Sequence, residues 1–316
     1  MLEVVYLEYP HDVSKVEIKE TALALGYFDG VHKGHQQVIS TAKKVAKEFG
    51  YQSGVMTFHP HPSVVLNRSN QHVQYITPLE DKIDQIAKLD IDVVYVVKFN
   101  EELAKLEPEE FVNVFLIGLN VKHVVAGFDF SYGRMGKGNM DSMKDHAKGE
   151  FTQTTIQKVT DQDQKISSTL IRKKLQKAEM QDVQHLLGRP FQLKGKVIKG
   201  DQRGRTIGFP TANIAFGDEY LLPKVGVYAV GVEVKNQYYY GMANIGYKPT
   251  FNKDEEKPTL EVYIFDFSGN IYDEELKLEL FSYIRGEKKF SGLEELKSQL
   301  RKDEEQIRHF FSTSSR

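Results

Sequence analysis

Two histidines beside a glycine-rich turn are the first residues whose types and spacing suggest chemistry. The segment 25–35 reads LGYFDGVHKGH, in which Gly26 and Gly30 permit a tight turn. His32 and His35 lie three residues apart, so both imidazoles share one face if a helix opens here. Phosphates bind at helix N-termini, where free N–H groups and the macrodipole point. The pair could stabilise charge on a nucleotide as pyrophosphate departs, or it could be two surface histidines on a capped turn.

A metal site is an alternative for the same histidines. His59 and His61, in the segment TFHPHP, could join the first pair. The sequence has no cysteine, no carboxylate is an obvious fourth ligand, and two prolines constrain the loop, so we do not expect zinc. The patterns G-x-x-x-x-G-K-[ST] and G-x-G-x-x-G are both absent, which excludes a P-loop and a dinucleotide fingerprint.

A second group of polar residues occupies the segment 199–214, KGDQRGRTIGFPTANI. Its glycines, Gly200, Gly204 and Gly208, would let backbone amides wrap phosphates. Thr211 and Asn213 each offer a side-chain oxygen, a hard ligand suited to Mg²⁺, and in an extended chain they face the same side. The alternative is a flexible loop that leads into an edge strand, but the density of Gly, Arg and Thr favours a phosphate site.

The first half of the chain alternates strand and helix signals, which predicts a parallel α/β sheet. One helix is expected to stop at Gly50, and another to open with Thr77 as N-cap and Glu80 completing a capping box. The expected strands are Ala22–Tyr27, Tyr51–Phe58, Ile91–Lys98 and Val121–Ala126. The expected helices cover about 34–49, a stretch that opens at Thr77-Pro78-Leu79-Glu80, a stretch that follows Pro108, Ser168–Lys177 and Glu179–Leu187.

After Gly188 the strands follow one another without helices, which favours an antiparallel barrel. Hairpin turns are expected at 235–236 and at 268–270. An amphipathic helix over 292–311 is expected to pack on the barrel, rather than to bind a partner. The expected strands are Phe191–Lys199, Gly226–Val234, Tyr238–Asn244, Thr259–Phe267 and Leu276–Ile284.

Length and charge limit the class of protein. A chain of 316 residues predicts two domains, and the change of pattern places them at 1–187 and 188–316. The net charge of −2 argues against a dedicated nucleic-acid binder. Glu3 and Glu8 with no basic leader, and the lack of any run of 18 apolar residues, argue against secretion and membrane insertion. These features favour a cytoplasmic protein.

The first half resembles bacterial FAD synthetases. LGYFDGVHKGH is similar to the HxGH signature of nucleotidyltransferases, and three further segments resemble FAD synthetase motifs: TFHPHP (57–62), GFDFSYGRMGKG (127–138) and ISSTLIR (166–172). The resemblance implies a Rossmann-like domain that transfers AMP from ATP to FMN. His32, His35 and Arg172 are then expected to stabilise the transition state, since an arginine can bind phosphate oxygens bidentately.

The second half resembles riboflavin kinases, through GRTIGFPTANI, the GVY segment at 226–228 and NIGYKPTF at 244–251. Glu261 falls where that family places its general base, which accepts the proton of the riboflavin 5′-hydroxyl. Many relatives carry a histidine two residues later, where this chain has Tyr263. Thr211 and Asn213 are expected to hold Mg²⁺.

Together the resemblances imply a bifunctional riboflavin kinase and FAD synthetase whose partners are riboflavin, FMN, FAD and ATP. Mg²⁺ accompanies ATP, and no tightly bound redox cofactor is expected. No nucleic acid or membrane partner is expected, and the chain is expected to be a monomer or a weak homo-oligomer. The implied ATP- and flavin-binding residues are Gly26, Phe28, Asp29, Gly30, Gly34, His59, Pro60, Asp129, Ser167, Ser168, Thr169, Gly200, Arg205, Gly208, Asn244 and Arg285.

Two other functions remain open. One is an FAD synthetase whose barrel binds flavin without phosphorylating it, against which the complete set Thr211, Asn213 and Glu261 argues. The other is a flavin-sensing regulator, whose expected basic patch or appended nucleic-acid-binding segment is missing from the sequence.

Overall fold

The computed structural model describes residues 2–10, 18–66, 73–161, 164–200, 204, 207–217, 219–235, 237–249 and 256–314. By its internal contacts the chain divides into two compact units, Met1–Ser168 and Thr169–Arg316. This division falls before the two helices that the sequence assigns to the first domain, so the boundary at 187/188 stays a prediction.

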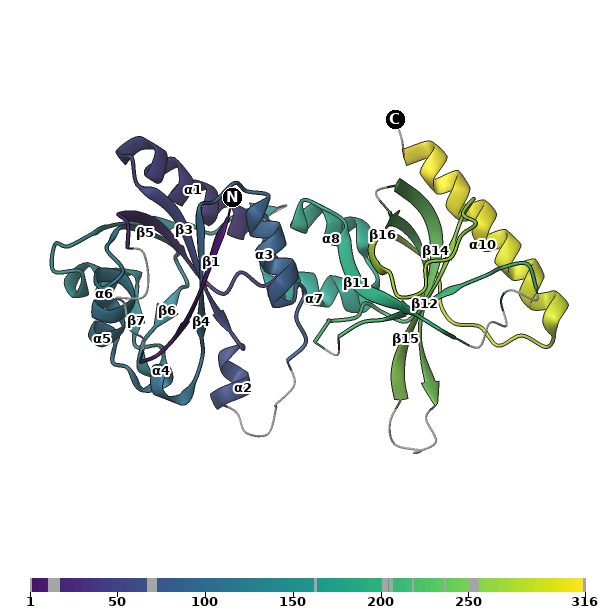
Figure 1. Ribbon diagram of the computed structural model, residues 1–316, viewed down its shortest axis with the longest axis horizontal. Coiled ribbons are helices and arrows are strands. Elements are labelled where there is room, and N and C mark those ends of the chain that lie inside the picture. The colour runs from purple at the N-terminus through teal and green to yellow at the C-terminus, as the bar shows by residue number, and fades with distance from the viewer. Residues whose placement is uncertain are drawn as a thin grey trace. The chain divides into compact units, whose positions relative to one another are not determined.

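The N-terminal unit is built on a six-stranded sheet in which every neighbouring pair is parallel, with strand order β1-β4-β3-β2-β5-β8 (Figure 1). The predicted parallel sheet is thereby confirmed, and four strands lie within two residues of their predicted ends. The strands are β1 (Glu3–Glu8), β2 (Thr21–Leu25), β3 (Gln52–His59), β4 (Val93–Lys98), β5 (Val121–Gly127) and β8 (Thr152–Ile156).

The sequence did not reveal the two edge strands of this sheet. β8 reads TQTTI and β1 reads EVVYLE, and neither is fully buried. An edge strand pairs on one side only and lacks the long apolar run of a central strand. β2, by contrast, is buried at all five positions and lies in the middle of the sheet.

Helices cover both faces of the sheet. One core cluster joins the sheet to α1 and α3, and another joins it to α5 and α6. Two small hairpins, β6 with β7 and β9 with β10, lie outside the sheet. The bounds are α1 (Lys33–Phe49), α2 (Pro62–Leu66), α3 (Leu79–Ala87), α4 (Glu101–Lys105), α5 (Pro108–Val112), a π-helical turn (Asn113–Ile117), α6 (Met140–His146), β6 (Ser131–Tyr132), β7 (Gly138–Asn139), β9 (Thr160–Asp161) and β10 (Gln164–Lys165).

The helix ends test the capping predictions. α1 ends at Gly50, which has a left-handed backbone with φ 73°, as predicted. The predicted N-cap Thr77 is wrong, because α3 begins at Leu79 with Pro78 as its N-cap and no side-chain cap bond. The backbone N–H of Thr77 instead donates to Oδ1 of Asp29, at 3.1 Å. The segment before α3 is therefore tied to the histidine turn rather than to its own helix.

The strand order places a switch point at β2. The chain builds β3 and β4 outward on one side of β2, whereas β5 and β8 follow on the other side. Ligands of open α/β sheets bind at the carboxyl ends of strands on either side of such a reversal. The histidine turn follows β2 and Asp129 follows β5, so both lie at this position.

The second unit contains a closed barrel with strand order β11-β12-β15-β14-β13-β16, in which every pair is antiparallel (Figure 1). This confirms the predicted barrel. The sequence did not give β12 its own strand, since it is only four residues long. The strands are β11 (Phe191–Ile198), β12 (Ala212–Ala215), β13 (Gly226–Val234), β14 (Gln237–Pro249), β15 (Glu256–Ile264) and β16 (Glu275–Arg285).

One predicted hairpin is wrong. β13 and β14 pair up to Val234 and Gln237, which agrees with a turn between them. The turn expected at 268–270 would make β15 and β16 neighbours, but β15 pairs with β12 and β14 while β16 pairs with β11 and β13. The Ser-Gly-Asn turn residues thus belong to a longer connection, because strand pairing in a barrel is set by contacts distant in sequence.

The helices of this unit are α7 (Ser168–Lys177), α8 (Met180–Leu187) and α10 (Leu293–Ser314). α10, yellow in Figure 1, packs on the barrel as predicted. Ile307 and Phe311 of α10 join Val227, Ala229 and Met242 in one core cluster.

Candidate active site

The turn after β2 holds an uncommon backbone. Phe28, Gly30 and Val31 have positive φ angles of 55°, 90° and 40°. Such a conformation costs of order 1–3 kcal/mol for a non-glycine residue and persists only where the surroundings impose it. Phe28 and Val31 are each 1% exposed, and burial of such side chains is worth about 1.5–3 kcal/mol apiece, which offsets the strain.

His32 and His35 meet at the start of α1. His32 is the N-cap residue, and its Nδ1 accepts from the backbone N–H of His35 at 3.2 Å. The two rings stack with centroids 3.5 Å apart, so the predicted shared face is confirmed. Phe28 packs edge-on against the His35 ring with ring centroids 5.3 Å apart, which makes it a buried support for that ring.

His35 has an incomplete hydrogen-bond set. Its Nδ1 is buried, and within the part of the chain that the structure describes no group hydrogen-bonds to it. Burial, with positive charge on His32, Lys82 and Lys165, holds the pKa of His35 well below its usual range. A neutral, unsatisfied imidazole among cationic groups is suited to an anionic ligand, because buried polar atoms are nearly always paired in the working molecule.

Three other segments converge on this turn. Ser168 at the start of α7 donates from Oγ to the carbonyl of Asp29, at 2.8 Å. Asp129, just after β5, forms an ion pair with Lys165 of β10. His59, at the end of β3, is half-buried, and burial together with the charge of Lys82 lowers its pKa.

Sequence reasoning missed Lys82, which lies in the first turn of α3 and is only 2% exposed. Its Nζ donates to the carbonyl of Tyr27 at 2.9 Å and to Oγ1 of Thr57 at 3.3 Å. Burial lowers the pKa of Lys82 to about 8, and the nearby Asp29 carboxylate opposes that shift. A single lysine in an amphipathic helix gives no sequence signal of burial.

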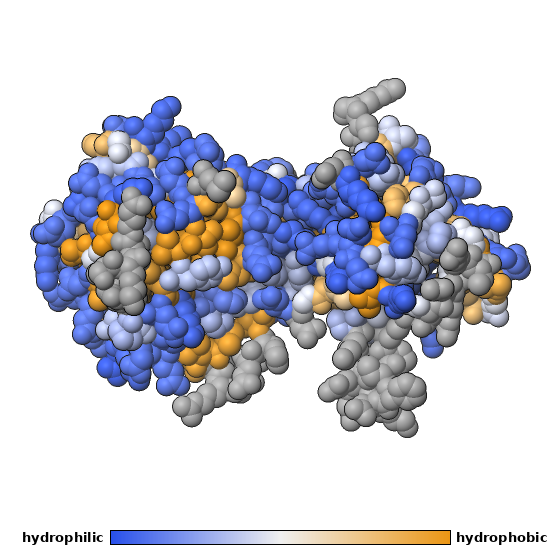
Figure 2. Space-filling model, viewed as in Figure 1, coloured by the Kyte–Doolittle hydropathy of each residue, from blue (hydrophilic) through white to orange (hydrophobic). Residues whose placement is uncertain are grey.

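Sequence reasoning also missed a hollow of about 600 Å³ in this unit. Its walls carry six aromatic side chains, and α2 contributes Pro62, Val65 and Leu66. Figure 2 shows hydrophobic surface over α2. The aromatic residues are Tyr27, Phe58, Phe99, Phe111, Phe130 and Tyr132. A planar, largely apolar ring system fits such walls.

In the barrel, three predicted residues form one row. Asn213 of β12 pairs with Glu261 of β15, and Glu261 pairs with Asn244 of β14 on its other side. Directly paired residues project from the same face of a sheet, so the three side chains lie together. The register therefore brings together residues that are up to 48 positions apart in sequence.

The glycine-rich segment packs closely on the predicted metal ligands. A Cβ on Gly200 would lie 2.1 Å from Nδ2 of Asn213, and one on Gly204 would lie 3.4 Å from Oγ1 of Thr211. Gly208 has a φ of 87°, which favours glycine. The space that a Cβ would fill at Gly200 is thus occupied by the Asn213 amide. Two neutral oxygen donors next to the Glu261 carboxylate fit a hard cation such as Mg²⁺.

Gly200→Ala is expected to slow the riboflavin phosphorylation that the resemblance implies for the barrel about 10-fold or more, because the added methyl group must displace the Asn213 amide. Gly217→Ala is the matched control, since its Cβ would meet no atom closer than 3.6 Å. The rate of FMN formation as a function of MgATP measures the effect. Equal rates in both variants would contradict a role for Asn213.

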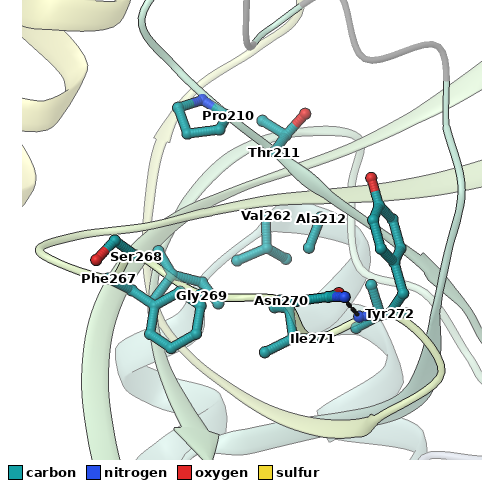
Figure 3. Close-up of a pocket in the computed structure, with 12 residues that line it drawn as sticks. Pro210, Thr211, Ala212, Val262, Phe267, Ser268, Gly269, Asn270, Ile271 and Tyr272 are labelled. Carbon is teal, nitrogen blue, oxygen red and sulfur yellow. Dashed lines mark hydrogen bonds between the residues drawn. The ribbon is translucent and has the colours of Figure 1, made fainter.

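A hollow of about 610 Å³ lies beside Thr211. In Figure 3, Pro210 and Thr211 lie on one side of it, Val262 and Ala212 form its floor, and the connection 267–272 lies opposite. The backbone N–H of Tyr272 donates to Oδ1 of Asn270 at 3.1 Å and so orders that connection. The segment mistaken for a hairpin is therefore a pocket wall.

Tyr263 packs edge-on against Phe209 with ring centroids 5.3 Å apart. Phe209 is 7% exposed and directly precedes the Pro-Thr-Ala-Asn stretch. The tyrosine thus supports the segment that carries Thr211 and Asn213.

Arg285, predicted to contact flavin, forms a bidentate ion pair with Asp303 of α10. Its Nε donates to both carboxylate oxygens, at 3.0 and 2.9 Å, and Asp303 is 1% exposed. Gln299 donates to the same carboxylate. The contact with flavin stays a prediction, while the structure shows Arg285 fastening α10 to the barrel.

Asp303→Asn is expected to lower the free energy of unfolding of this unit by about 3 kcal/mol, because it leaves the Arg285 guanidinium without its buried counter-charge. Asp266→Asn is the control, since Asp266 pairs with Arg308 at an exposed position and its replacement should lower the free energy of unfolding much less. Denaturant unfolding of both variants measures the difference. Similar destabilisation by the two substitutions would contradict this account.

Some predicted residues are not brought to either site by a described contact. Arg205 lies outside the described residues. Thr169 and Arg172 lie on α7 and belong to the second compact unit. Among the residues that the structure describes, no group of three or more His, Cys, Asp or Glu could hold a metal ion.

Comparison with known proteins assigns both halves. The FAD synthetase family model matches residues 14–170, and the riboflavin kinase model matches residues 187–311. A bifunctional riboflavin kinase/FMN adenylyltransferase of Bacillus subtilis strain 168 is 50% identical over 98% of this chain and 99% of its own length. This chain belongs to that family.

The relative from Listeria monocytogenes, with the same name, is 48% identical over 98% of this chain and 99% of its own. A solved structure from Streptococcus pneumoniae, described as a macrolide-efflux protein, matches with a TM-score of 0.88 and 32% identity, over 96% of this chain and 99% of that one. Of the helices in the described ranges, none is long and apolar enough to cross a membrane.

Proposed function

We propose that this chain makes FAD from riboflavin in two ATP-dependent steps. The barrel transfers the γ-phosphoryl group of ATP to the 5′-hydroxyl of riboflavin, which gives FMN and ADP. The N-terminal unit then transfers AMP from a second ATP to FMN, which gives FAD and pyrophosphate. The names of the relatives and the matches of both family models support this order of activities.

The kinase step is carried by the row of Asn213, Glu261 and Asn244. Glu261 accepts the proton of the riboflavin 5′-hydroxyl while the hydroxyl oxygen attacks the γ-phosphorus of ATP. The bond between the γ-phosphorus and the oxygen that bridges to the β-phosphate breaks, and ADP leaves. Thr211 and Asn213 would hold Mg²⁺, which when bound neutralises phosphate charge.

The adenylyl transfer needs no protein nucleophile, because an oxygen of the FMN phosphate attacks the α-phosphorus and pyrophosphate leaves. His32, His35 and the opening of α1 bind the phosphates and stabilise the charge that develops on them. A part for Arg172 in stabilising the transition state stays a prediction from the sequence. The aromatic hollow is proposed to hold the flavin ring, since Tyr27 of its wall directly precedes the histidine turn.

We expect the chain to act in the cytoplasm, where ATP is supplied, as a monomer or weak homo-oligomer and without a nucleic-acid or membrane partner. The proposal as a whole is tested with ATP labelled at one phosphorus. With riboflavin as the starting flavin, label at the γ position should appear in FMN. With FMN as the starting flavin, label at the α position should appear in FAD. If α-label enters FAD but γ-label never enters FMN, the barrel only binds flavin and the two-step proposal is wrong.

A further inference from the structure

Lys82 is almost completely buried. It lies next to the carboxyl ends of β2 and β3, at the site proposed for adenylyl transfer. Its Nζ reaches the carbonyl of Tyr27, two residues beyond β2, and Oγ1 of Thr57, inside β3. The Thr57 hydroxyl also donates to the Tyr27 carbonyl at 2.9 Å, and Thr57 is 0% exposed. The three groups form a closed, buried triangle that ties α3, β2 and β3 together.

This triangle lies directly before the strained turn. Tyr27 is followed by Phe28, Gly30 and Val31 with their positive φ angles, and then by the histidine pair. A strained turn keeps its shape only when the groups around it leave no alternative. The Lys82 ammonium fixes the carbonyl at the entrance of the turn, and Asp29 fixes the segment before α3 through the Thr77 N–H.

A buried ammonium is an expensive way to hold a carbonyl, since a neutral donor would avoid the cost of removing a charge from water. The positive charge of the Lys82 ammonium therefore needs a functional explanation. The titratable groups facing it are Asp29 of the turn, His35 of α1 and His59 at the end of β3, and Lys82 lowers the pKa of both histidines. Lys165 of β10 and His32 add positive charge around the same imidazole.

We propose that Lys82 is a positioning residue for adenylyl transfer, whose ammonium clamps the entrance of the histidine turn and adds a fixed positive charge behind the phosphate site. The clamp holds the His32 and His35 rings in position to contact the phosphates. The charge acts on the anionic phosphates through a medium of low polarity, where it is weakly screened. This inference rests on the proposed function of the N-terminal unit.

The experiment compares Lys82→Met, which removes donor and charge, with Lys82→Gln, which keeps a donor. Lys82→Met is expected to lower kcat/KM for ATP in FAD formation about 10- to 100-fold, by analogy with the loss of a preorganised electrostatic group. Lys82→Gln should recover only the part that the clamp contributes. Lys47→Met, an exposed lysine of α1, is the matched control and should match the wild type. FMN formation by the barrel reports the amount of intact chain.

A pH profile separates this role from a merely structural one. Wild-type kcat/KM should fall as the pH rises through about 8, where Lys82 loses its proton, and the Lys82→Met profile should lack that fall. Wild-type activity in Lys82→Met, or a slow variant with the wild-type fall near pH 8, would overturn the proposal.

A measurement that does not depend on enzyme turnover separates the role of Lys82 from the proposed function of the N-terminal unit. In histidine NMR titrations, Lys82→Met should raise the pKa of His35 and His59, since a nearby positive charge has gone. Unchanged histidine titrations would overturn the role of the charge. Wild-type protein that forms no FAD would refute the proposed function itself, and the titrations would still decide whether Lys82 acts on the histidines.

Discussion

His35→Ala is expected to slow FAD formation from FMN roughly 100-fold or more, while FMN formation from riboflavin keeps its wild-type rate. The imidazole is held neutral under the His32 ring, with a buried Nδ1 that the described chain leaves without a partner. Alanine removes the imidazole, so that no side chain at position 35 can hydrogen-bond to the phosphates. Separate initial rates with FMN and with riboflavin measure the two activities.

The controls for this substitution are His35→Asn and His309→Ala. Asparagine keeps a short polar donor and should recover part of the FAD-forming rate. His309 is exposed on α10, so its replacement should change neither rate. A parallel loss of both activities in His35→Ala would contradict two independent sites, and unchanged FAD formation would remove His35 from the mechanism.

Glu261→Gln is expected to lower the rate of riboflavin phosphorylation roughly 10²- to 10⁴-fold, because glutamine cannot accept the proton of the 5′-hydroxyl. The substitution preserves size, so the row with Asn213 and Asn244 should stay in place. FMN supplied to the variant should still become FAD at the wild-type rate. Chromatography of the flavins, with riboflavin or FMN as the starting compound, separates the two effects.

Glu233→Gln is the matched control, since Glu233 is an exposed strand glutamate of the same barrel. It should leave both rates unchanged. If Glu261→Gln phosphorylates riboflavin at the wild-type rate, another group accepts the proton and the row has only a structural role.

The sequence could predict the sheet and the barrel because their signals are local. Buried strands such as β2 and β3 give short apolar runs, and helices such as α1 give periodic patterns with a glycine stop. The segment 268–270 shows the limit of this reasoning. Its turn residues correctly mark a reversal, but which strands become neighbours depends on pairings that no local pattern encodes.

The candidate sites likewise contain residues that a local pattern identifies and residues that only the folded chain brings together. His32 and His35 could be found because a turn, a helix start and a spacing of three occur within one segment. The row of Asn213, Glu261 and Asn244 requires the register of three strands, which only the folded barrel supplies. Lys82 could not be found, because its burial arises when α3 packs under the ends of β2 and β3, and a lysine in a nine-residue helix otherwise indicates a solvated face.

The measurement that tests the central claim most directly is a time course of the purified chain with riboflavin, ATP and Mg²⁺, in which chromatography resolves riboflavin, FMN and FAD. The account predicts that FMN rises first and then declines as FAD accumulates. Riboflavin that stays unchanged while supplied FMN becomes FAD would contradict the kinase role of the barrel. If FMN accumulates without any FAD, the role assigned to the histidine turn is wrong.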